Sequence, residues 1–295
     1  MPRLTIMAPL LLWACASAPT APAVACLPAA GYTLLQLDAL KAADWALPEE
    51  NERNALARAL TPCLNAPDPA LRDGIVFEGL QHWLRAKALS DETMRALADD
   101  LEARLAAPEG AGFERPFAAL VLSEVVRADR IEPYMADAQR RRLLDSSLAY
   151  FASVRDYRGF DEAEGWRHGV AHGADLLLQL SLNPAFSHDD LIRIREAITS
   201  QVAPEGHFYV YGESERLARP IIFMAQRGLI SQEEWTRYFE QFPDRENVFA
   251  SQAGLAWRHN VNAFLQAVWI NARLDENAED DALLPGAEAA LRAMP

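Results

Sequence analysis

The chain has 295 residues, of which 51% are hydrophobic and 24% are charged, and this ordinary globular composition argues against disorder and against a membrane-spanning bundle. Its formal net charge of −14 argues against a nucleic-acid binder, which needs a basic face to neutralise phosphates, and is a poor match for an anionic membrane surface. Only 14 glycines accompany abundant Ala, Leu, Glu and Arg, which favours helices over a turn-rich β fold.

The N-terminus has the features of an export signal. The start "MPR" is basic, and "LTIMAPLLLWACA" (4–16) is an apolar run that is too short to span a bilayer. Ala23 and Ala25 are the small residues of an Ala-x-Ala cleavage site. The sequence therefore predicts a signal peptide over 1–25 and a periplasmic or secreted protein. The alternative is a lipoprotein anchored through Cys15 or Cys26, both of which lie in imperfect lipidation motifs.

Cysteine usage fits export. Cleavage after Ala25 leaves Cys26 and Cys63, an even number in an oxidising compartment. We expect a disulfide between them that pins the N-terminal segment to the end of an early helix. The alternative is two unpaired thiols in a chain that stays in the cytosol.

The segment 26–33 is expected to be extended, and the rest of the chain, 34–295, is expected to form one all-α domain. Hydroxyl N-caps at Ser90, Ser187 and Ser231 each precede acidic residues, and Ser231 with Glu234 has the spacing of a capping box. The periodicity predicts helices at roughly 33–44, 50–64, 69–87, 91–106, 113–129, 134–153, 162–182, 188–201, 213–227, 232–241, 247–274 and 279–293.

Two segments indicate how these helices are arranged. "WLRAKALSDETMRAL" (83–97) and "FMAQRGLISQEEWTRYF" (223–239) each contain a helix end, a short turn, a Ser cap and an amphipathic helix. This pattern is typical of stacked helical hairpins. No fixed period links the Ser caps, so we expect an irregular α–α superhelix with HEAT-like pairs rather than a regular solenoid.

The stretch "GWRHGVAHGADLLLQLSLNP" (165–184) places polar side chains in an apolar segment. On a helix starting near Glu162, His172, Asp175 and Gln179 lie within about 40° of His168, at spacings i+4, i+7 and i+11. Leucines flank this stripe, and it holds no Lys, Arg or Glu. The pattern predicts a mostly buried helix whose polar stripe faces a cleft or another polar element.

Three interpretations of the stripe stay open. His168 and His172, at i and i+4, could bind a divalent metal together with Asp175, although Gly169 stands where a zincin motif needs Glu. Alternatively, a histidine oriented by a carboxylate could act as a general acid or base, but no partner nucleophile is identifiable. The third interpretation is a buried, hydrogen-bonded network that links the helix to its neighbours.

Polar residues from three other segments are candidates for the same cleft. They come from "RDYRGFDEAEGW" (155–166), "GHFYVYGESERLARP" (206–220) and "WRHNVNAFLQAVW" (257–269). Helix capping and surface ion pairing are their alternative roles. The candidate cleft residues are Trp166, His168, His172, Asp175, Gln179, Asp156, Arg158, Glu213, Arg216, Arg258 and Asn260.

These segments, with "PDPALRDGIVFEGLQHWL" (67–84), resemble the bacterial DUF2785 family, whose biochemical function is not established. The resemblance covers roughly residues 35–275 and rests most on the pattern Gly-Trp-x-His-x-x-Ala-His-x-x-Asp at 165–175. Arg72 and Asp73 match an early "DPxLRD" element, and Arg258 and Asn260 match a late "RxN" element. The resemblance implies an all-helical fold and makes the stripe a family hallmark, but it supplies no reaction. The exported N-terminus departs from what is expected of cytosolic relatives.

The sequence therefore favours an exported cell-envelope protein with a non-catalytic binding or scaffold role, whose polar groove takes a small molecule, protein or peptide. The alternative is a metal-assisted hydrolase that uses His168, His172 and Asp175 with a divalent metal. We expect no nucleic-acid partner and no transmembrane segment.

Overall fold

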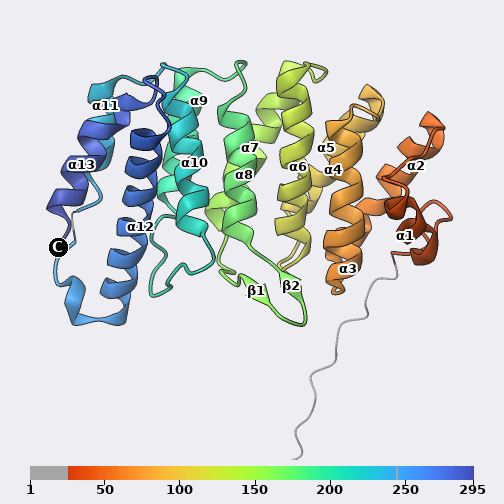
Figure 1. Ribbon diagram of the computed structural model, residues 1–295, viewed down its shortest axis with the longest axis horizontal. Coiled ribbons are helices and arrows are strands. Elements are labelled where there is room, and N and C mark those ends of the chain that lie inside the picture. The colour runs from red at the N-terminus through yellow and green to blue at the C-terminus, as the bar shows by residue number, and fades with distance from the viewer. Residues whose placement is uncertain (1–25, 244) are drawn as a thin grey trace, which may run out of the picture.

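Stacked helices form the molecule, as the computed structural model shows (Figure 1). The structure describes residues 26–243 and 245–295. The signal peptide expected over 1–25, with the lipidation site at Cys15, lies outside the described residues.

Short connections join the helices along the chain. The elements are α1 (Leu34–Ala42), α2 (Glu50–Leu60), η1 (Thr61–Asn65), α3 (Pro69–Leu71), η2 (Arg72–Phe77), α4 (Glu78–Arg85), α5 (Asp91–Leu105), α6 (Glu114–Ile131), α7 (Asp137–Ser153), β1 (Phe160–Asp161), β2 (Gly165–Trp166), α8 (Gly169–Ser181), α9 (His188–Thr199), α10 (Glu213–Ala225), α11 (Gln232–Glu240), η3 (Val248–Ala250), α12 (Gln252–Leu274), η4 (Asp281–Leu283) and α13 (Leu284–Ala293).

The helices form two layers. In Figure 1, α4, α6, α8, α10 and α12 lie side by side in one layer, and α5, α7 and α9 lie behind them. Contacts of α6 with α8, of α8 with α10 and of α10 with α12 are among the most extensive in the fold. One continuous apolar core runs between the layers. The expected single all-α domain is therefore confirmed, whereas the HEAT-like character of the pairs stays a prediction.

The expected hydroxyl caps are present. The hydroxyl of Ser231 accepts a hydrogen bond from the backbone N–H of Glu234, whose carboxylate returns to the Ser231 N–H at 2.9 Å, which completes the capping box. Ser187 and Asp190 form a second capping box at α9, and the Ser90 hydroxyl accepts the backbone N–H of Thr93 at the start of α5. These bonds satisfy amides that a helix N-terminus leaves without partners.

The expected helix over 162–182 is wrong at its N-terminal end. Residues 160–166 form a two-stranded hairpin, and α8 starts only at Gly169. The Asp161 carboxylate accepts the backbone N–H groups of Ala163 and Glu164, at 2.8 and 3.0 Å, and this holds the turn. His168 then adopts a left-handed φ of 53°, which a continuing helix does not allow.

The first helix of the α4 layer contains an irregular stretch. Residues Arg72–Phe77 form a π-helical segment between α3 and α4, in a run that was expected to be regular over 69–87. Such segments widen the helix and shift the faces that side chains occupy, and they are frequent at functional sites. Here the segment directs Arg72 inward and leaves Asp73 and Phe77 on the cleft described below.

The segment 26–33 is tied down by the predicted disulfide. Cys26 and Cys63 are bonded, with a Cα–Cα distance of 5.2 Å. The backbones of Ala29 and Tyr32 pair as an isolated bridge, so the segment turns back on itself. The disulfide thus attaches this segment to η1, at the end of α2.

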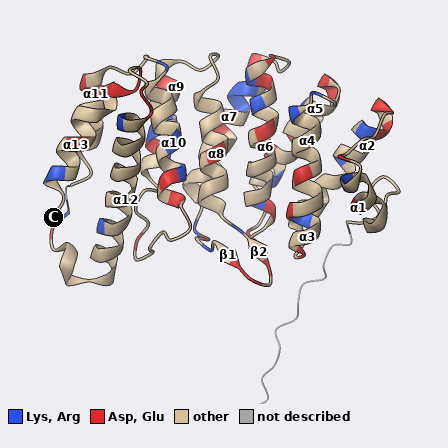
Figure 2. Ribbon diagram, in the orientation of Figure 1, with Lys and Arg blue, Asp and Glu red and all other residues tan. Residues whose placement is uncertain are grey.

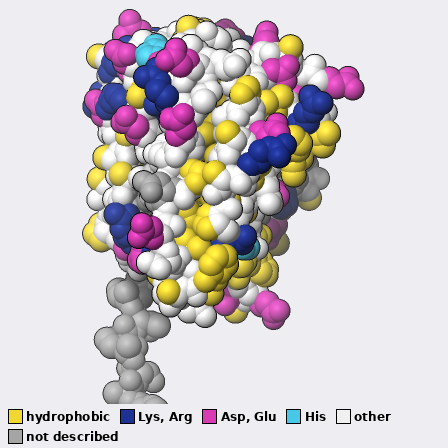
Figure 3. Space-filling view, turned by 90° about the vertical axis from the view of Figure 1, so that its left-hand side faces the viewer, with side chains coloured by type: hydrophobic (Ala, Val, Ile, Leu, Met, Phe, Trp, Pro, Cys, Tyr) yellow, Lys and Arg dark blue, Asp and Glu magenta, His cyan; other side chains and the backbone are white. Residues whose placement is uncertain are grey.

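The C-terminal end of the two layers carries exposed apolar side chains. Figure 3 shows hydrophobic side chains between charged ones over this end of the molecule. Among the exposed residues are Phe249, Ile270 and Leu274. Within the part of the chain that the structure describes, no helix is both long and apolar enough to cross a membrane.

Removing the disulfide should lower the free energy of unfolding by roughly 3–4 kcal/mol, because the bridge closes a long loop in the unfolded chain. Urea denaturation of the Cys26→Ser/Cys63→Ser variant against the oxidised protein measures this loss. Equal midpoints and slopes for the two proteins would contradict it. A free-thiol count of two in oxidised protein would refute the bridge itself.

Candidate functional site

A polar cleft of about 720 Å³ crosses the layer of α4, α6, α8 and α10. Strand β2 and the segment 207–212 lie at the end where α8 and α10 begin. Six of the residues expected in the cleft line it, namely Trp166, His168, His172, Asp175, Gln179 and Arg216. The structure therefore brings the complete stripe of α8 to one surface, with Arg216 beside it from α10.

Three other expected residues support the neighbourhood of the cleft without lining it. Glu213 is buried, and its carboxylate accepts the backbone N–H of Tyr211 at 2.9 Å. Asp156 and Arg158 form an ion pair with each other, and Arg158 also donates to the carbonyl of Ala111. This pair fixes the loop that precedes the hairpin.

Arg258 and Asn260 lie farther away, on α12. Asn260 is fully buried, accepts the backbone N–H of Tyr209 at 2.9 Å and donates to the carbonyl of His207 at 2.8 Å. It holds the segment that leads to α10. Arg258 donates to the backbone carbonyl of Pro295. Arg258 therefore contacts the C-terminal end of the fold and does not line the cleft.

The wall opposite α8 and the neighbouring part of α10 add residues that were not among the expected cleft residues. They are Phe77, Gln81 and Arg85 from the first helix of the layer, Phe117, Leu120, Ser123 and Glu124 from α6, and Tyr211, Glu215 and Arg219, whereas Asp73 was indicated only by the family resemblance. The spacing of Asp73, Phe77, Gln81 and Arg85 at four-residue steps is the signal that could have located this wall. Glu124, buried in the apolar run of α6, is a second signal.

The two histidines are positioned by the start of α8. His168 is the N-cap residue, and its backbone carbonyl accepts the N–H of His172 in the first helical turn. The His168 ring stacks on Trp166, with centroids 4.7 Å apart, and meets His172 edge-on at 5.8 Å. Phe117 also meets His172 edge-on, at 5.2 Å between ring centroids. Aromatic neighbours thus fix both imidazoles.

Burial makes both imidazoles neutral. Each residue is only 7% exposed. Desolvation, with the nearby Arg216 charge, lowers the pKa of His168 to about 4, and desolvation with the neighbouring His168 lowers the pKa of His172 well below its usual value. His168 Nε2 and His172 Nδ1 are buried and have no hydrogen-bond partner, although His168 Nε2 lies 3.8 Å from Glu213 Oε1. Unpartnered buried nitrogens of this kind are costly and call for an explanation.

The charges of the cleft are largely paired with each other. Asp175 forms an ion pair with Arg216, and Arg219 lies 3.9 Å from its other oxygen. Arg85 Nε donates to the Glu124 carboxylate at 2.9 Å. Burial raises the pKa of Asp175, and the neighbouring arginine opposes this shift. Figure 2 shows acidic and basic residues interspersed on the helices of this layer.

A buried arginine joins the segments around the cleft. Arg72 is fully buried, and its guanidinium lies over the rings of Phe113 and Phe117, at 4.1 and 4.7 Å. It donates to the carbonyls of Ala66 and Glu164, at 2.9 and 2.8 Å. Through these bonds one side chain connects the first helix of the layer, the start of α6 and the hairpin that carries Trp166.

Metal binding by the stripe stays a prediction. Within residues 26–243 and 245–295, no three or more His, Cys, Asp or Glu side chains come together in an arrangement that could hold an ion. The Asp175 carboxylate is engaged by Arg216 and so would have to leave an ion pair to become a ligand. What the two neutral imidazoles offer directly is hydrogen bonding, since each keeps one nitrogen free.

A family model described as a protein of unknown function, DUF2785, matches residues 106–270. The match includes α6, α8, α10 and most of α12, and it leaves out the α4 wall of the cleft, which the expected resemblance over 35–275 included. No curated protein and no solved structure matches the chain.

The lowered histidine pKa values predict acid sensitivity. The unfolded chain takes up protons below pH 6.5, whereas the folded cleft keeps His168 neutral down to about pH 4, so stability falls as the pH is lowered through this window. Each histidine contributes at most about 1.4 kcal/mol per pH unit. Urea denaturation between pH 7 and 4.5 should therefore show a shallower pH dependence for His172→Gln than for the wild type.

His188→Gln is the matched control. The pKa of this exposed histidine is raised by hydrogen bonds to Asp189 and Glu234, so its removal should change the pH dependence in the opposite sense. Identical pH dependence for the wild type and His172→Gln would contradict the neutral state of the buried imidazole.

Proposed function

The chain belongs to the DUF2785 family, and we propose that it is an exported cell-envelope protein that binds a small, neutral, hydroxyl-bearing molecule in the cleft without changing it chemically. The observation that carries this proposal is the pair of buried, neutral imidazoles that line one cleft, each with an unpartnered nitrogen. A hydroxyl group suits such nitrogens because it both donates and accepts.

The neutral character of the ligand is inferred from the charges around it. Asp175 is paired with Arg216, and Glu124 with Arg85, so an ion that bound to one of these four groups would have to open its pair. Breaking a partly buried pair costs free energy that a neutral ligand does not have to supply. The cleft is thus better suited to an uncharged polar molecule than to an acid or an amine.

The aromatic end of the cleft supports a ligand with a flat apolar face. Trp166 and Tyr211 meet edge-on at 5.9 Å, and Phe160 packs against Trp166 at 5.1 Å. Tyr211 and Phe160 are exposed, so ring faces are accessible beside hydrogen-bonding groups. Aromatic faces with adjacent polar groups match a saccharide, whose rings present C–H groups on one face and hydroxyls around the edge.

Export is supported by the disulfide, because such bonds persist in oxidising compartments and are rare in the cytosol. It also bears on the lipoprotein alternative. The Cys26 sulfur is bonded to Cys63, and a sulfur in a disulfide is not free to carry a lipid. This favours a periplasmic or secreted protein over one that is lipidated at Cys26, and it leaves Cys15 as the other anchoring site.

Binding of neutral saccharides tests the ligand class. Calorimetric titration of the full mature chain with glucose, N-acetylglucosamine and cellobiose should give saturable binding of at least one sugar. Trp166→Ala should weaken the affinity about fivefold to tenfold, because a lost aromatic contact is worth about 1–1.4 kcal/mol. His172→Leu should weaken it similarly by removing the unpartnered nitrogen.

Trp257→Ala is the matched control, since Trp257 lies on α12 and does not line the cleft. Its affinity should equal that of the wild type. If no sugar binds, or if glucuronic acid or a tripeptide binds and the neutral sugars do not, the neutral hydroxyl-bearing class is wrong. Circular dichroism of each variant separates loss of binding from loss of fold.

The alternative function is a metal-assisted hydrolase at His168, His172 and Asp175. Zinc analysis after EDTA treatment, reloading and gel filtration distinguishes the two. We predict less than stoichiometric zinc in the wild type and in His172→Ala alike. One zinc ion per chain in the wild type and none in the variant would favour the hydrolase and contradict the binding function.

A further inference from the structure

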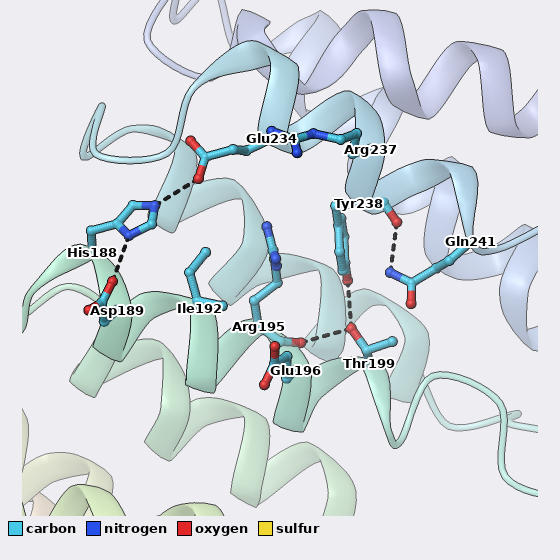
Figure 4. A pocket seen from close by; sticks show the side chains of 10 residues that line it. All are labelled: His188, Asp189, Ile192, Arg195, Glu196, Thr199, Glu234, Arg237, Tyr238 and Gln241. Carbon is cyan, nitrogen blue, oxygen red and sulfur yellow. Dashed lines mark hydrogen bonds and ion pairs between the residues drawn. The ribbon is translucent and has the colours of Figure 1, made fainter.

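A second pocket, of about 710 Å³, lies between α9 and α11. It shares no lining residue with the cleft. The side chains that Figure 4 draws around it are His188, Asp189, Ile192, Arg195, Glu196, Thr199, Glu234, Arg237, Tyr238 and Gln241. Nothing in the function proposed above uses this pocket.

Arg195 projects into the pocket without a polar partner. Figure 4 shows its side chain rising from α9 between Ile192 and Tyr238 toward α11, and no dashed line joins its guanidinium to the other side chains drawn. Nε and Nη1 are buried and lack hydrogen-bond partners. The guanidinium lies over two aromatic rings, at 4.9 Å from the centroid of Tyr238 and 5.8 Å from that of Trp235. These rings hold the charged group in place but accept none of its N–H groups in ordinary hydrogen bonds.

Several other polar groups of the same pocket have partners. His188 bridges Asp189 and Glu234, with nitrogen–oxygen distances of 3.0 and 2.9 Å. The hydroxyls of Thr199 and Tyr238 are 3.1 Å apart. Both carboxylates that contact His188 are thus directed toward that imidazole rather than toward Arg195. The unpartnered guanidinium of Arg195 is therefore an exception to these pairings.

Such an exception costs stability, because buried donors of a charged group lose their hydrogen bonds to water. A planar guanidinium that is fixed by aromatic packing is preorganised for an oxyanion, since it donates parallel N–H groups to two oxygens at once. Arg237 lines the same pocket and adds a second positive charge, which lies 3.8 Å from the Glu233 carboxylate.

We propose that the pocket between α9 and α11 binds the oxyanion group of a small molecule, a carboxylate or a phosphate, through the guanidinium of Arg195. The apolar side chain of Ile192 and the ring of Tyr238 would contact the remainder of that molecule. This site is independent of the ligand in the cleft, so either assignment can fail without the other.

Nuclear magnetic resonance titration of the full mature chain tests the proposal, with inorganic phosphate and acetate as probes. The total ionic strength is held constant with sodium chloride, so that general screening does not change. The Arg195 side-chain Nε–Hε signal, assigned by its absence in Arg195→Lys, should shift saturably with at least one anion. The anion that binds more tightly identifies the group as phosphate or carboxylate.

Two variants separate the guanidinium from charge alone. Arg195→Lys keeps the positive charge but loses the planar guanidinium with its parallel N–H donors. Its affinity for the anion, followed through backbone amide signals, should fall at least tenfold. Arg193→Gln is the matched control, because Arg193 lies on the same helix, is exposed and pairs with Asp145 at 2.7 Å. Its affinity should stay within twofold of the wild type.

Three outcomes would overturn the site. They are the absence of a saturable shift with either anion, a response equal to that of added chloride, and wild-type affinity in Arg195→Lys. The wild-type titration decides the matter even if a variant folds poorly. A variant that melts at a lower temperature while the wild type binds neither anion would assign Arg195 a purely structural role between α9 and α11.

Discussion

The cleft depends on one buried cation. Arg72 has no exposed surface, lies between two phenylalanine rings and bonds to backbone carbonyls from segments far apart in the chain, among them Glu164 in the hairpin. Removing one partner of a buried, bonded charge typically destabilises the fold by about 3–5 kcal/mol. Arg72 and the segments that it bonds to therefore stabilise one another's positions. The hairpin that Arg72 fixes carries Trp166, and the chain leaves it directly into His168 and α8. The geometry of the cleft is therefore set by a residue that does not line it.

The same arrangement explains why the cleft contains polar groups that do not stabilise the fold. The left-handed backbone at His168 ends the hairpin and turns its ring onto Trp166, where burial favours the neutral form. His172 follows one turn later with its own free nitrogen. A fold that maximised its stability would pair these atoms or replace them with apolar ones. Unpartnered groups held in place by a well-satisfied surrounding are typical of sites that keep hydrogen bonds for a ligand.

The sequence predicted the fold class, the caps and the stripe because each of these depends on local spacing. A helical wheel places His172, Asp175 and Gln179 together whatever the rest of the chain does. The hairpin was missed because its turn rests on Asp161 and its position on Arg72, about ninety residues away, and periodicity does not encode such contacts. The opposite wall was missed because its residues lie on the first helix of the layer and on α6, far before the stripe in the chain, and periodicity does not show which helices pack together. The pocket between α9 and α11 was missed because it depends on the Arg195 guanidinium having no partner on α11, and no local sequence pattern shows this.

The neutral state of the paired imidazoles is the property on which the binding function rests, and histidine ring ¹⁵N–¹H correlation spectra between pH 7.5 and 4.5 measure it directly. His168 and His172 should keep the nitrogen shifts of neutral tautomers to about pH 5, since desolvation lowers the pKa of His168 to about 4. The exposed His188, whose pKa is raised, should protonate first and serve as an internal reference. Protonation of His168 or His172 near the ordinary histidine pKa of about 6.5 would mean that the cleft is open to water, and would contradict the account.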